Sequence, residues 1–135
     1  MYSSETKIRV RYGETDKMGY VYHANYVQYF DIGRTELMRE LGLTYAKLEE
    51  TGIILPVRSL NINYIRPGFY DQELTLKTYL RIIPTVKIKF EYELFNPLNE
   101  LMSTGEVTLA FLDNITRRPV KPPKLFLNKV QSFFK

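Results

Sequence analysis

The feature that most constrains the fold is one long helical pattern followed by a change to strict alternation. Between residues 25 and 42, apolar side chains recur at helical spacing. This stripe consists of Tyr26, Tyr29, Phe30, Gly33, Leu37 and Leu41. From Ile53 onward the apolar residues recur at every second position, with short turns between the runs. One helix followed by consecutive strands predicts a single α+β domain over residues 1–135, with the helix packed on one face of an antiparallel sheet.

The ends and the middle of this helix carry further signals. Asn25 is predicted to cap the first turn, with Gln28 returning the bond as in a capping box. Gly42 is expected to end the helix. Gly33, in the middle of the buried stripe, would let the sheet come close, at a cost of about 1 kcal/mol relative to alanine. The charged residues are predicted to lie largely off the stripe: Asp31, Arg34, Glu36, Arg39 and Glu40.

The remaining elements are predicted from alternation and from turn residues. Strands are expected over residues 7–12, 60–64, 73–82, 86–94 and 101–112. Residues 13–22 hold two glycines and several polar side chains and are expected to form a loop. Residues 45–51 are predicted to be a short helix capped by Thr44. Residues 124–135 are predicted to be a helical tail with apolar contacts from Leu125, Leu127, Val130, Phe133 and Phe134.

Composition excludes several classes of chemistry. The chain has 135 residues, one histidine and no cysteine, so disulfides, thiolate metal sites and cysteine nucleophiles are excluded and no metal site is expected. The N-terminal residues MYSSETKIRV lack the apolar core of a secretion signal, and a cytoplasmic protein without a transmembrane segment is expected. The net charge of +4 favours anionic partners. The basic residues form no dense run, so nucleic acid is not among the partners expected.

The loop before the helix holds the chemically interesting residues. Asp16 lies in it, and His23 follows seven residues later, immediately before the helix. The free amides and the positive dipole end of the helix are expected to face this loop. A carboxylate beside a helix start suits a reaction in which an acyl oxygen becomes negative. Taken alone, an aspartate such as Asp16 is more often a turn residue or a capping acid than a catalyst, and a histidine such as His23 is more often a cap or another hydrogen-bonding group.

A spaced set of residues resembles a known signature. The run Asp16-x-x-Gly19-x-Val21-x-His23-x-x-Tyr26-x-x-Tyr29, followed by Arg34, is similar to the N-terminal signature of the 4-hydroxybenzoyl-CoA thioesterase family of hotdog-fold acyl-CoA thioesterases. The resemblance extends through Tyr64-x-Arg66-Pro67, Tyr70-Asp71, Leu74 and the KFEYEL run. It implies a long central helix wrapped by a curved antiparallel sheet, two chains paired edge to edge, and active sites at the dimer interface. A homodimer or homotetramer is therefore expected.

The resemblance also implies catalytic roles. Asp16 matches the catalytic carboxylate, which acts on the thioester as a nucleophile or as a general base for water. His23 matches a histidine that orients the acid, the water or the thioester. The backbone amides of Asn25 and Tyr26 are expected to polarise the carbonyl oxygen. No cofactor is implied, because coenzyme A is part of the substrate.

Other residues are expected to bind substrate. Tyr22 and Tyr26 match positions that line the acyl pocket. Arg66, Lys87 and Lys89 are candidates for the phosphates of coenzyme A, placed by charge and strand position, although a solvated strand face is the simplest interpretation of the two lysines. Asp31 departs from the family pattern, because many members have glutamate at this position. The departure lies on the helix and not in the catalytic loop, so it is expected to affect the choice of substrate more than the activity itself.

Three functions fit these observations. The first is hydrolysis of an acyl-CoA thioester. The second is hydrolysis of the same bond on an acyl carrier protein, whose acidic surface would dock on basic strands. The third is a non-catalytic hotdog module that binds a ligand, a partner protein or an acidic membrane surface, in which a change of Asp16 has no consequence.

Overall fold

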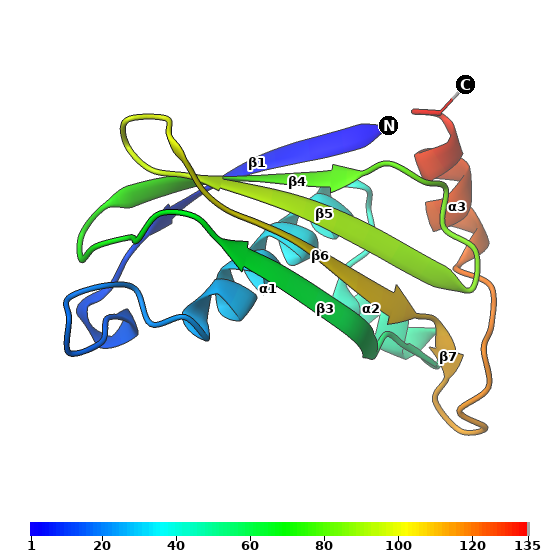
Figure 1. Cartoon of the computed structure of the whole chain (residues 1–135). Helices are drawn as coiled ribbons and strands as arrows, with labels where there is room; N and C mark the ends of the chain where they lie inside the picture. The colour runs from blue at the N-terminus through cyan, green and yellow to red at the C-terminus, as the bar shows by residue number, and fades with distance from the viewer. Residues whose placement is uncertain (135) are drawn as a thin grey trace.

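A five-stranded antiparallel sheet curves around one long helix, α1 (Figure 1). The structure is a computed structural model that describes residues 1–134. The strands are β1 (Tyr2–Arg9), β2 (Ile53–Ile54), β3 (Val57–Tyr64), β4 (Glu73–Leu80), β5 (Lys87–Phe95), β6 (Leu101–Ala110) and β7 (Leu112–Asp113). The helices are the 3-10 turn η1 (Tyr12–Glu14), α1 (Asn25–Glu40), α2 (Tyr45–Glu50) and α3 (Lys124–Gln131). Among the described residues, no helix is long and apolar enough to span a bilayer.

The strand order in the sheet is β1-β4-β5-β6-β3, and every neighbouring pair is antiparallel. The strands β1 and β3 are therefore the two edges, while β2 and β7 pair separately. Along β4 and β5 every second side chain is buried, as the alternation predicts. These inward side chains form the surface on which α1 packs.

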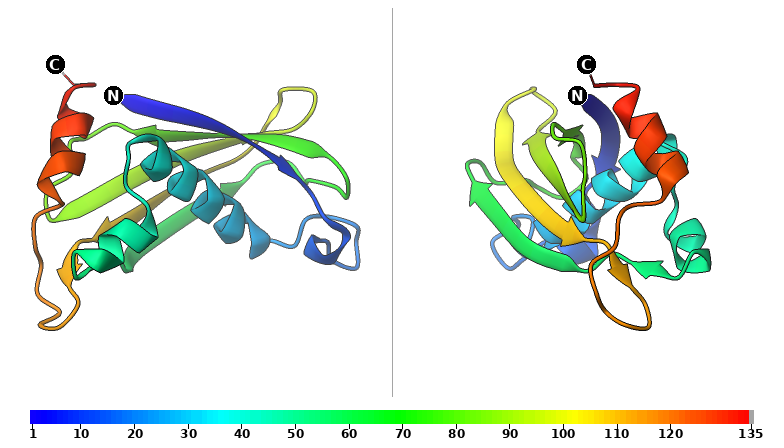
Figure 2. Two further views of the ribbon diagram at one scale, coloured as in Figure 1. Left: turned by 180° about the vertical axis from the view of Figure 1, so that it is seen from behind. Right: turned by 90° about the vertical axis from the view of Figure 1, so that its right-hand side faces the viewer.

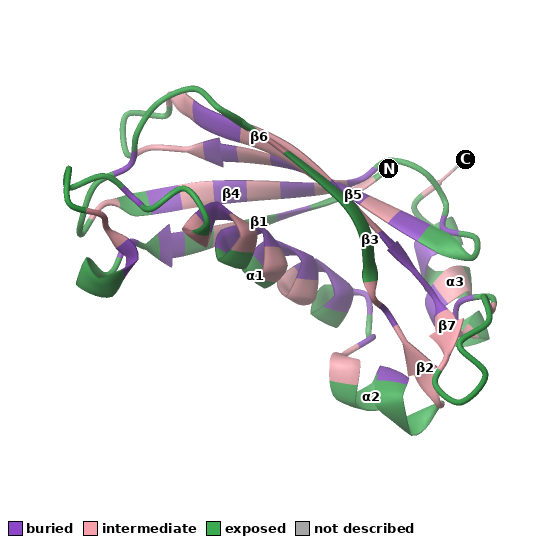
Figure 3. Ribbon diagram, turned by 60° about the horizontal axis from the view of Figure 1, so that its bottom comes forward, coloured by how far each residue is buried: buried purple, intermediate pink, exposed green. Residues whose placement is uncertain are grey.

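The predicted apolar stripe of α1 is buried against the concave face of the sheet (Figure 3). Gly33 lets α1 and strand β4 come close together, as its position in the stripe predicts. A β-carbon there would overlap Thr78 Oγ1 and Leu76 Cδ2 of strand β4. The sheet therefore touches the helix backbone at this point, and any larger residue would push the two layers apart.

The predicted cap at the start of α1 is wrong. The cap residue is Ala24, and no side chain caps it. Asn25 is the first helical residue, and its Nδ2 donates to the carbonyl oxygen of Glu14 at 2.8 Å. The asparagine therefore ties the helix to the preceding loop. At the other end Gly42 has a φ of +84°, which fits the predicted terminating glycine.

Strand β1 begins at Tyr2, five residues earlier than predicted, and ends at Arg9. Its N-terminal half lacks the apolar alternation that identifies a strand. Two of its inward side chains are polar and are satisfied by α1: Tyr2 OH and Ser4 Oγ donate to the two carboxylate oxygens of Glu40, each at 2.6 Å. A buried hydroxyl with a charged partner thus replaces an apolar contact.

Other predicted boundaries need smaller corrections. Strand β3 begins at Val57, and β4 ends at Leu80. The predicted strand over 101–112 divides into β6 and β7. The short strand β2 was not predicted, because two consecutive isoleucines show no alternation.

The two smaller helices close one end of the molecule (Figure 2). Thr44 caps α2 as predicted, accepting from the Lys47 amide. In α3 the buried residues are Phe126 and Val130, whereas Leu125, predicted as a contact, is 85% exposed. The predicted end of this helix at Lys135 lies outside the described residues.

Arg34 of α1 was grouped with the charges that lie largely off the apolar stripe. The structure shows that it is nevertheless buried, with only 7% of the residue exposed. Its Nη2 donates to Asp31 Oδ1 at 3.0 Å. Its guanidinium carbon lies 5.9 Å from the ring centroid of Tyr45 in α2. The charged head is thus held between α1 and α2.

Candidate active site

Asp16 lies at the start of a tight turn in the loop before α1. The turn is closed by two backbone bonds, from the Asp16 amide to the Tyr20 carbonyl at 2.8 Å and from the Gly19 amide to the Asp16 carbonyl at 3.0 Å. Gly19 has a φ of +82°, a conformation that glycine adopts without strain. One carboxylate oxygen, Oδ1, accepts from the amides of Met18 and Tyr20 at 2.9 and 3.2 Å. Among the described residues, Oδ2 has no hydrogen-bond donor.

Glu14, two residues earlier, anchors the same loop to the helix. Its carboxylate accepts from the Arg11 amide at 2.8 Å and from Tyr29 OH at 2.9 Å, and it pairs with the Arg11 guanidinium. Its own carbonyl accepts from the Tyr22 amide and from Asn25 Nδ2, both at 2.8 Å. Burial acts to raise the pKa of Glu14. The hydrogen bonds that Arg11 and Tyr29 donate to its carboxylate, together with the Arg11 charge, outweigh this effect, so the pKa lies below its ordinary value.

Two backbone amides at the start of α1 are free. The Asn25 amide donates to the Tyr22 carbonyl at 2.9 Å, and the Tyr26 amide points to the His23 carbonyl at 3.4 Å. Within residues 1–134, the amides of His23 and Ala24 have no protein acceptor. The free donors are therefore two residues earlier than the sequence suggested, and they lie at the positive end of the helix dipole.

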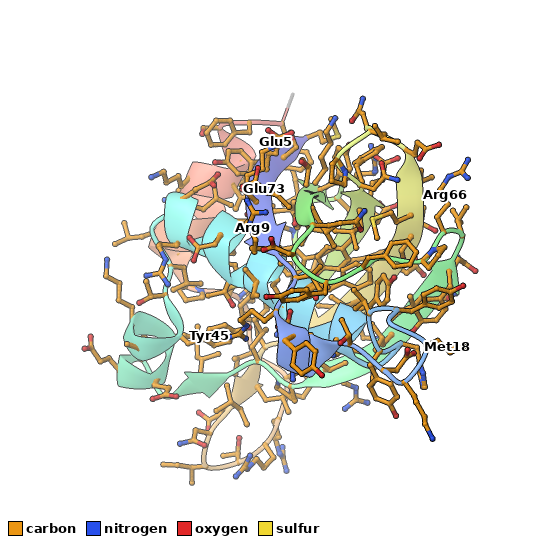
Figure 4. All side chains as sticks on the ribbon, turned by 90° about the vertical axis from the view of Figure 1, so that its left-hand side faces the viewer. Glu5, Arg9, Met18, Tyr45, Arg66 and Glu73 are labelled. Carbon is orange, nitrogen blue, oxygen red and sulfur yellow. The ribbon has the colours of Figure 1, made fainter. Side chains whose placement is uncertain are left out.

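A hollow of about 340 Å³ lies beside this turn. Its ionisable lining residues, tyrosines aside, are Asp16, His23 and Arg66. The remainder of its wall is mainly apolar or aromatic: Met18, Tyr20, Val21, Tyr26, Tyr64, Ile65 and Pro67. Figure 4 views the molecule from this end, with Met18 and Arg66 labelled. A few convergent polar groups in an apolar wall are typical of a small-molecule site.

Tyrosine rings build the inner wall of the hollow. Tyr26 and Tyr64 meet edge to face with ring centroids 5.0 Å apart, and Tyr64 OH donates to the His23 carbonyl at 2.8 Å. Burial raises the pKa of both Tyr26 and Tyr64, and the backbone of Gly68 partly offsets this for Tyr26. Both phenols therefore stay neutral near pH 7 and act as hydrogen-bonding groups.

Four of the residues singled out in the sequence come together at this hollow: Asp16, His23, Tyr26 and Arg66. Four others do not line it. Tyr22 is exposed, with its ring 4.5 Å from the His23 imidazole centroid, and Asn25 is occupied by Glu14. Lys87 and Lys89 lie on the outer face of β5, and Lys89 Nζ pairs with Glu106 at 3.2 Å.

Sequence reasoning missed two parts of the site. Tyr64 and Ile65, at the end of β3, form much of the wall, and the Tyr64-x-Arg66-Pro67 run was the available signal. Glu14 was missed because a glutamate in a polar loop carries no pattern of its own. No group of histidine and acidic side chains within residues 1–134 is arranged to hold a metal ion.

The arrangement defines what the site can do chemically. Asp16, whose carboxylate has one fixed and one free oxygen, lines an apolar hollow together with His23, whose amide is one of the two free amides at the helix start. The free oxygen is available to attack a carbonyl or to take a proton from water. The amides can stabilise a developing oxyanion. These are the two requirements of acyl transfer to water.

A central helix wrapped by a curved antiparallel sheet, with this site at the helix start, is the hotdog fold of thioesterases. The chain belongs to the thioesterase-like superfamily, whose family model matches residues 10–130. It is 35% identical over 126 residues to YneP of Bacillus subtilis (strain 168), covering 93% of this chain and 91% of YneP. It is 36% identical over 119 residues to acyl-CoA thioesterase YbgC of Haemophilus influenzae, covering 87% of this chain and 86% of YbgC.

A solved structure shows the same fold. DHNA-CoA thioesterase from Staphylococcus aureus superposes with a TM-score of 0.85 and 36% sequence identity, covering 99% of this chain and 85% of that chain. The hotdog fold expected from the sequence is therefore confirmed.

Proposed function

We propose that this chain hydrolyses acyl-CoA thioesters to a free acid and coenzyme A, with Asp16 as nucleophile or general base. One observation carries the proposal: Asp16, whose carboxylate is held by one oxygen and has the other free, lines an apolar hollow in a member of a thioesterase superfamily. The named relatives that act on acyl-CoA support the same substrate class.

Two chemical routes fit the free oxygen. As a general base, Oδ2 takes a proton from water while the water oxygen bonds to the thioester carbon; the C–S bond then breaks and the thiolate receives the proton. As a nucleophile, Oδ2 bonds to the carbonyl carbon and displaces the thiolate, and water hydrolyses the resulting anhydride. Only the second route can place ¹⁸O in the Asp16 side chain during turnover in labelled water, which mass spectrometry of the Asp16 peptide detects.

The start of α1 supports the negative charge that forms on the carbonyl oxygen in either route. The free amides of His23 and Ala24 are the donors in this proposal, in place of those of Asn25 and Tyr26. The His23 imidazole, on the wall of the hollow, orients the water or the thioester. The tyrosine wall, including Tyr26, contacts the acyl group, with Tyr22 at its exposed margin.

Binding of the substrate phosphates needs cationic side chains, and a single chain provides one such side chain at the hollow. Arg66 lines it, and its Nη2 is 4.0 Å from Glu100 Oε2, an exposed pair that a phosphate can replace. Lys87 and Lys89 can contact the phosphates only in an assembly of chains, because they lie on a different face of this one.

A homodimer through strand β3 is the assembly that the surface supports. β3 is an edge strand, and its apolar side chains are unusually open: Val57 is 52% exposed, Leu60 42% and Tyr64 51%. Long apolar edge strands without a partner promote association. Antiparallel pairing of two β3 strands would set the Val57 end of one beside the Tyr64 end of the other, so each hollow would lie at the dimer interface. A homotetramer of two such dimers is the larger candidate.

The test of function is hydrolysis of short, long and aromatic acyl-CoAs by the wild type and Asp16→Asn, with a thiol-trapping dye. Loss of a positioned carboxylate is expected to lower kcat by roughly 10²- to 10⁴-fold. Asp71→Asn, which alters another exposed loop acid away from the hollow, is the matched control and should retain full activity. Equal rates for wild type and Asp16→Asn would overturn the assignment of Asp16.

An acyl carrier protein is the second candidate substrate, favoured by the net charge of +4. Activity on matched acyl-CoA and acyl-carrier substrates separates the two candidate substrates, because docking of an acidic carrier would weaken strongly between 50 and 300 mM salt.

The variant Leu60→Lys tests the dimer, with light scattering as the measurement. A folded monomer with little activity is expected. An active monomer would contradict an interface site.

A further inference from the structure

A second hollow, here called the α2–β2 hollow, lies at the opposite end of strand β3 from the Asp16 site. It measures about 280 Å³ and is lined by helix α2, by β2 and by the residues that lead into β3. Apart from Glu49, its lining residues are apolar or aromatic: Tyr45, Leu48, Ile53, Ile54, Leu55 and Pro56. Within residues 1–134 the two hollows have no lining residue in common. Figure 3 shows α2 and β2 at this end, on the same side of the sheet as α1.

The walls of the α2–β2 hollow are held by contacts with the rest of the chain. Ile54 pairs with Leu112 of β7, and the Tyr45 ring centroid lies 5.9 Å from the guanidinium carbon of Arg34. Ile53 and Ile54 are only half-buried, so part of the apolar wall is open to water. A preformed apolar hollow that meets water gains free energy when an apolar group fills it.

Within one chain the α2–β2 hollow is far from Asp16. The hollow beside Asp16 includes Tyr64, the last residue of β3, whereas the α2–β2 hollow includes Pro56, which directly precedes β3. The strand has 8 residues, which at about 3.3 Å per residue places the two hollows roughly 25 Å apart. An acyl group held at Asp16 would have to follow the whole strand to reach the second hollow of its own chain.

The pairing of two β3 strands proposed above removes this distance. Antiparallel pairing would set the Val57 end of one strand beside the Tyr64 end of the other. Continued along the chain, it would set Leu55 and Pro56 of one chain beside Ile65 and Arg66 of the other. The first two residues line the α2–β2 hollow, and the last two line the hollow beside Asp16. Hollows that are far apart within one chain would therefore be neighbours across the dimer.

The two faces of the sheet at this point suit the two ends of an acyl-CoA. Lys87, a candidate for the phosphates, lies on the outer face of β5 and pairs in register with Ala110 of β6. The Ala110 amide donates to the Pro56 carbonyl at 3.1 Å, so the lysine and the α2–β2 hollow adjoin the same part of the sheet. The hollow is on the inner face, with α1 and α2. A charged nucleotide outside and an apolar acyl group inside would therefore not compete for space.

We propose that the acyl group of a thioester held at Asp16 of one chain extends into the α2–β2 hollow of the other chain, and that this hollow sets the acyl length that each site accepts. The substrate class is then unbranched aliphatic acyl thioesters, since the lining offers an acyl tail apolar contacts. The inference rests on the proposed hydrolysis and on the β3-paired dimer. It makes Ile54, at the wall of the hollow, a residue that determines specificity.

The first test compares kcat/KM for butanoyl-CoA and dodecanoyl-CoA. The wild type is expected to prefer dodecanoyl-CoA. Ile54→Trp, which fills the hollow, should lower the dodecanoyl-to-butanoyl ratio roughly hundred-fold, because each methylene denied burial costs about four-fold and three or four are excluded. Ile54→Ala, which enlarges the hollow and does not overpack it, should shift the preference toward hexadecanoyl-CoA. Ile82→Trp, at an isoleucine that is 62% exposed after β4, is the control and should keep the wild-type ratio.

The second test asks which chain supplies the hollow. Chains carrying two different affinity tags are coexpressed, and mixed dimers are purified through both tags. A wild-type chain paired with an Asp16→Asn/Ile54→Trp chain keeps one intact Asp16, whose partner hollow is filled, so the dodecanoyl-to-butanoyl ratio should fall roughly hundred-fold. An Ile54→Trp chain paired with an Asp16→Asn chain also keeps one intact Asp16, but its partner hollow is open, so the ratio should stay near the wild-type value.

The outcomes separate this inference from the proposed function. If each chain used its own hollow, the results for the two mixed dimers would be exchanged, and that exchange would overturn the proposal. An unchanged dodecanoyl-to-butanoyl ratio in both Ile54 variants would also overturn it. Wild-type hydrolysis of butanoyl-CoA or an aromatic acyl-CoA without hydrolysis of dodecanoyl-CoA would overturn this inference and leave the proposed function standing. Hydrolysis of none of these thioesters would overturn both.

Discussion

The two halves of the loop before α1 use their carboxylates in opposite ways. In the first half, Glu14 is almost fully buried, and its carboxylate is surrounded by donors from Arg11 and Tyr29. In the second half, Asp16 is only half-buried, and one of its oxygens is held by two turn amides while the other is free. The same chemical group is thus a structural anchor at one position and a reactive group two residues later.

The difference shows how a reactive carboxylate is kept in place without being neutralised. If all four lone-pair directions of Asp16 were satisfied, it would be a poor base and a poor nucleophile. The loop instead gains its rigidity from Glu14, which links η1 to α1. Changes at Glu14 should therefore affect stability first, and changes at Asp16 should affect catalysis alone.

The largest expected effect on stability comes from Glu14→Ala. The change leaves the buried Tyr29 hydroxyl and the Arg11 amide without their acceptor, at a cost of about 2–4 kcal/mol. Chemical denaturation of the variant measures this cost. Asp16→Ala is the matched control, and its loss should stay below about 1 kcal/mol. Equal losses at the two positions would erase the distinction between them.

Tyr29→Phe should have a smaller effect. It removes one donor to Glu14 and keeps the ring in the core, so about 1 kcal/mol is expected. Thermal unfolding checks the value, and Tyr26→Phe serves as a comparison that leaves Glu14 untouched. Because the Glu14 carboxylate and burial both raise the pKa of Tyr29, the phenol stays protonated and its bond persists through the alkaline range used for assays.

Gly19→Ala tests the turn that fixes Asp16. A non-glycine residue at φ +82° is strained, and a loss of about 1 kcal/mol is expected, with no steric clash to add to it. The strain acts on the turn that holds the Asp16 carboxylate. A decrease in kcat is therefore expected even under conditions in which the variant remains fully folded. Gly13→Ala, which has open space and no positive φ, should leave both quantities near the wild-type values.

The smallest expected effect is on how the free energy of unfolding changes with pH in acid. The pKa of Glu14 is lower in the folded chain than in the unfolded chain, so its ionised form favours folding. This contribution is complete above the ordinary glutamate pKa of about 4.3 and disappears as the pH falls through the lower folded-state pKa. In Glu14→Gln, the free energy of unfolding should fall less between pH 6 and pH 3 than in the wild type.

Much of the fold could be predicted because it follows from burial. The stripe of α1 and the alternation of β4 and β5 are direct consequences of which side chains meet in the core. The N-terminal half of β1 could not be predicted in this way. Its inward positions are polar and depend on Glu40, a residue 36 to 38 positions away that only the folded chain brings near.

The site shows the same division. Asp16, His23, Tyr26 and Arg66 belong to spaced motifs, and the fold brings them to one hollow. The free amides were expected at Asn25 and Tyr26, but these amides are directed to the carbonyls of Tyr22 and His23, three residues earlier. The burial of Arg34 could not be predicted, because charge patterns cannot show that α2 folds back over it. The misses at β1 and Arg34 involve contacts between segments distant in the sequence, whereas the miss over the free amides involves bonds within a single turn.

The pairing of β1 with β4 has a consequence for how the chain is made. Tyr2 lies opposite Leu80 and Arg9 opposite Glu73, so β1 cannot find its neighbour until about half of the protein has been synthesised. During that interval α1 has left the ribosome with its apolar stripe uncovered. At elongation rates of about 5–20 residues per second, this exposure lasts for seconds. A ribosome pause placed after residue 80, when α1 is outside the exit tunnel and β4 is still inside it, should therefore increase aggregation of the nascent chain more than one placed after residue 42, when α1 is also inside.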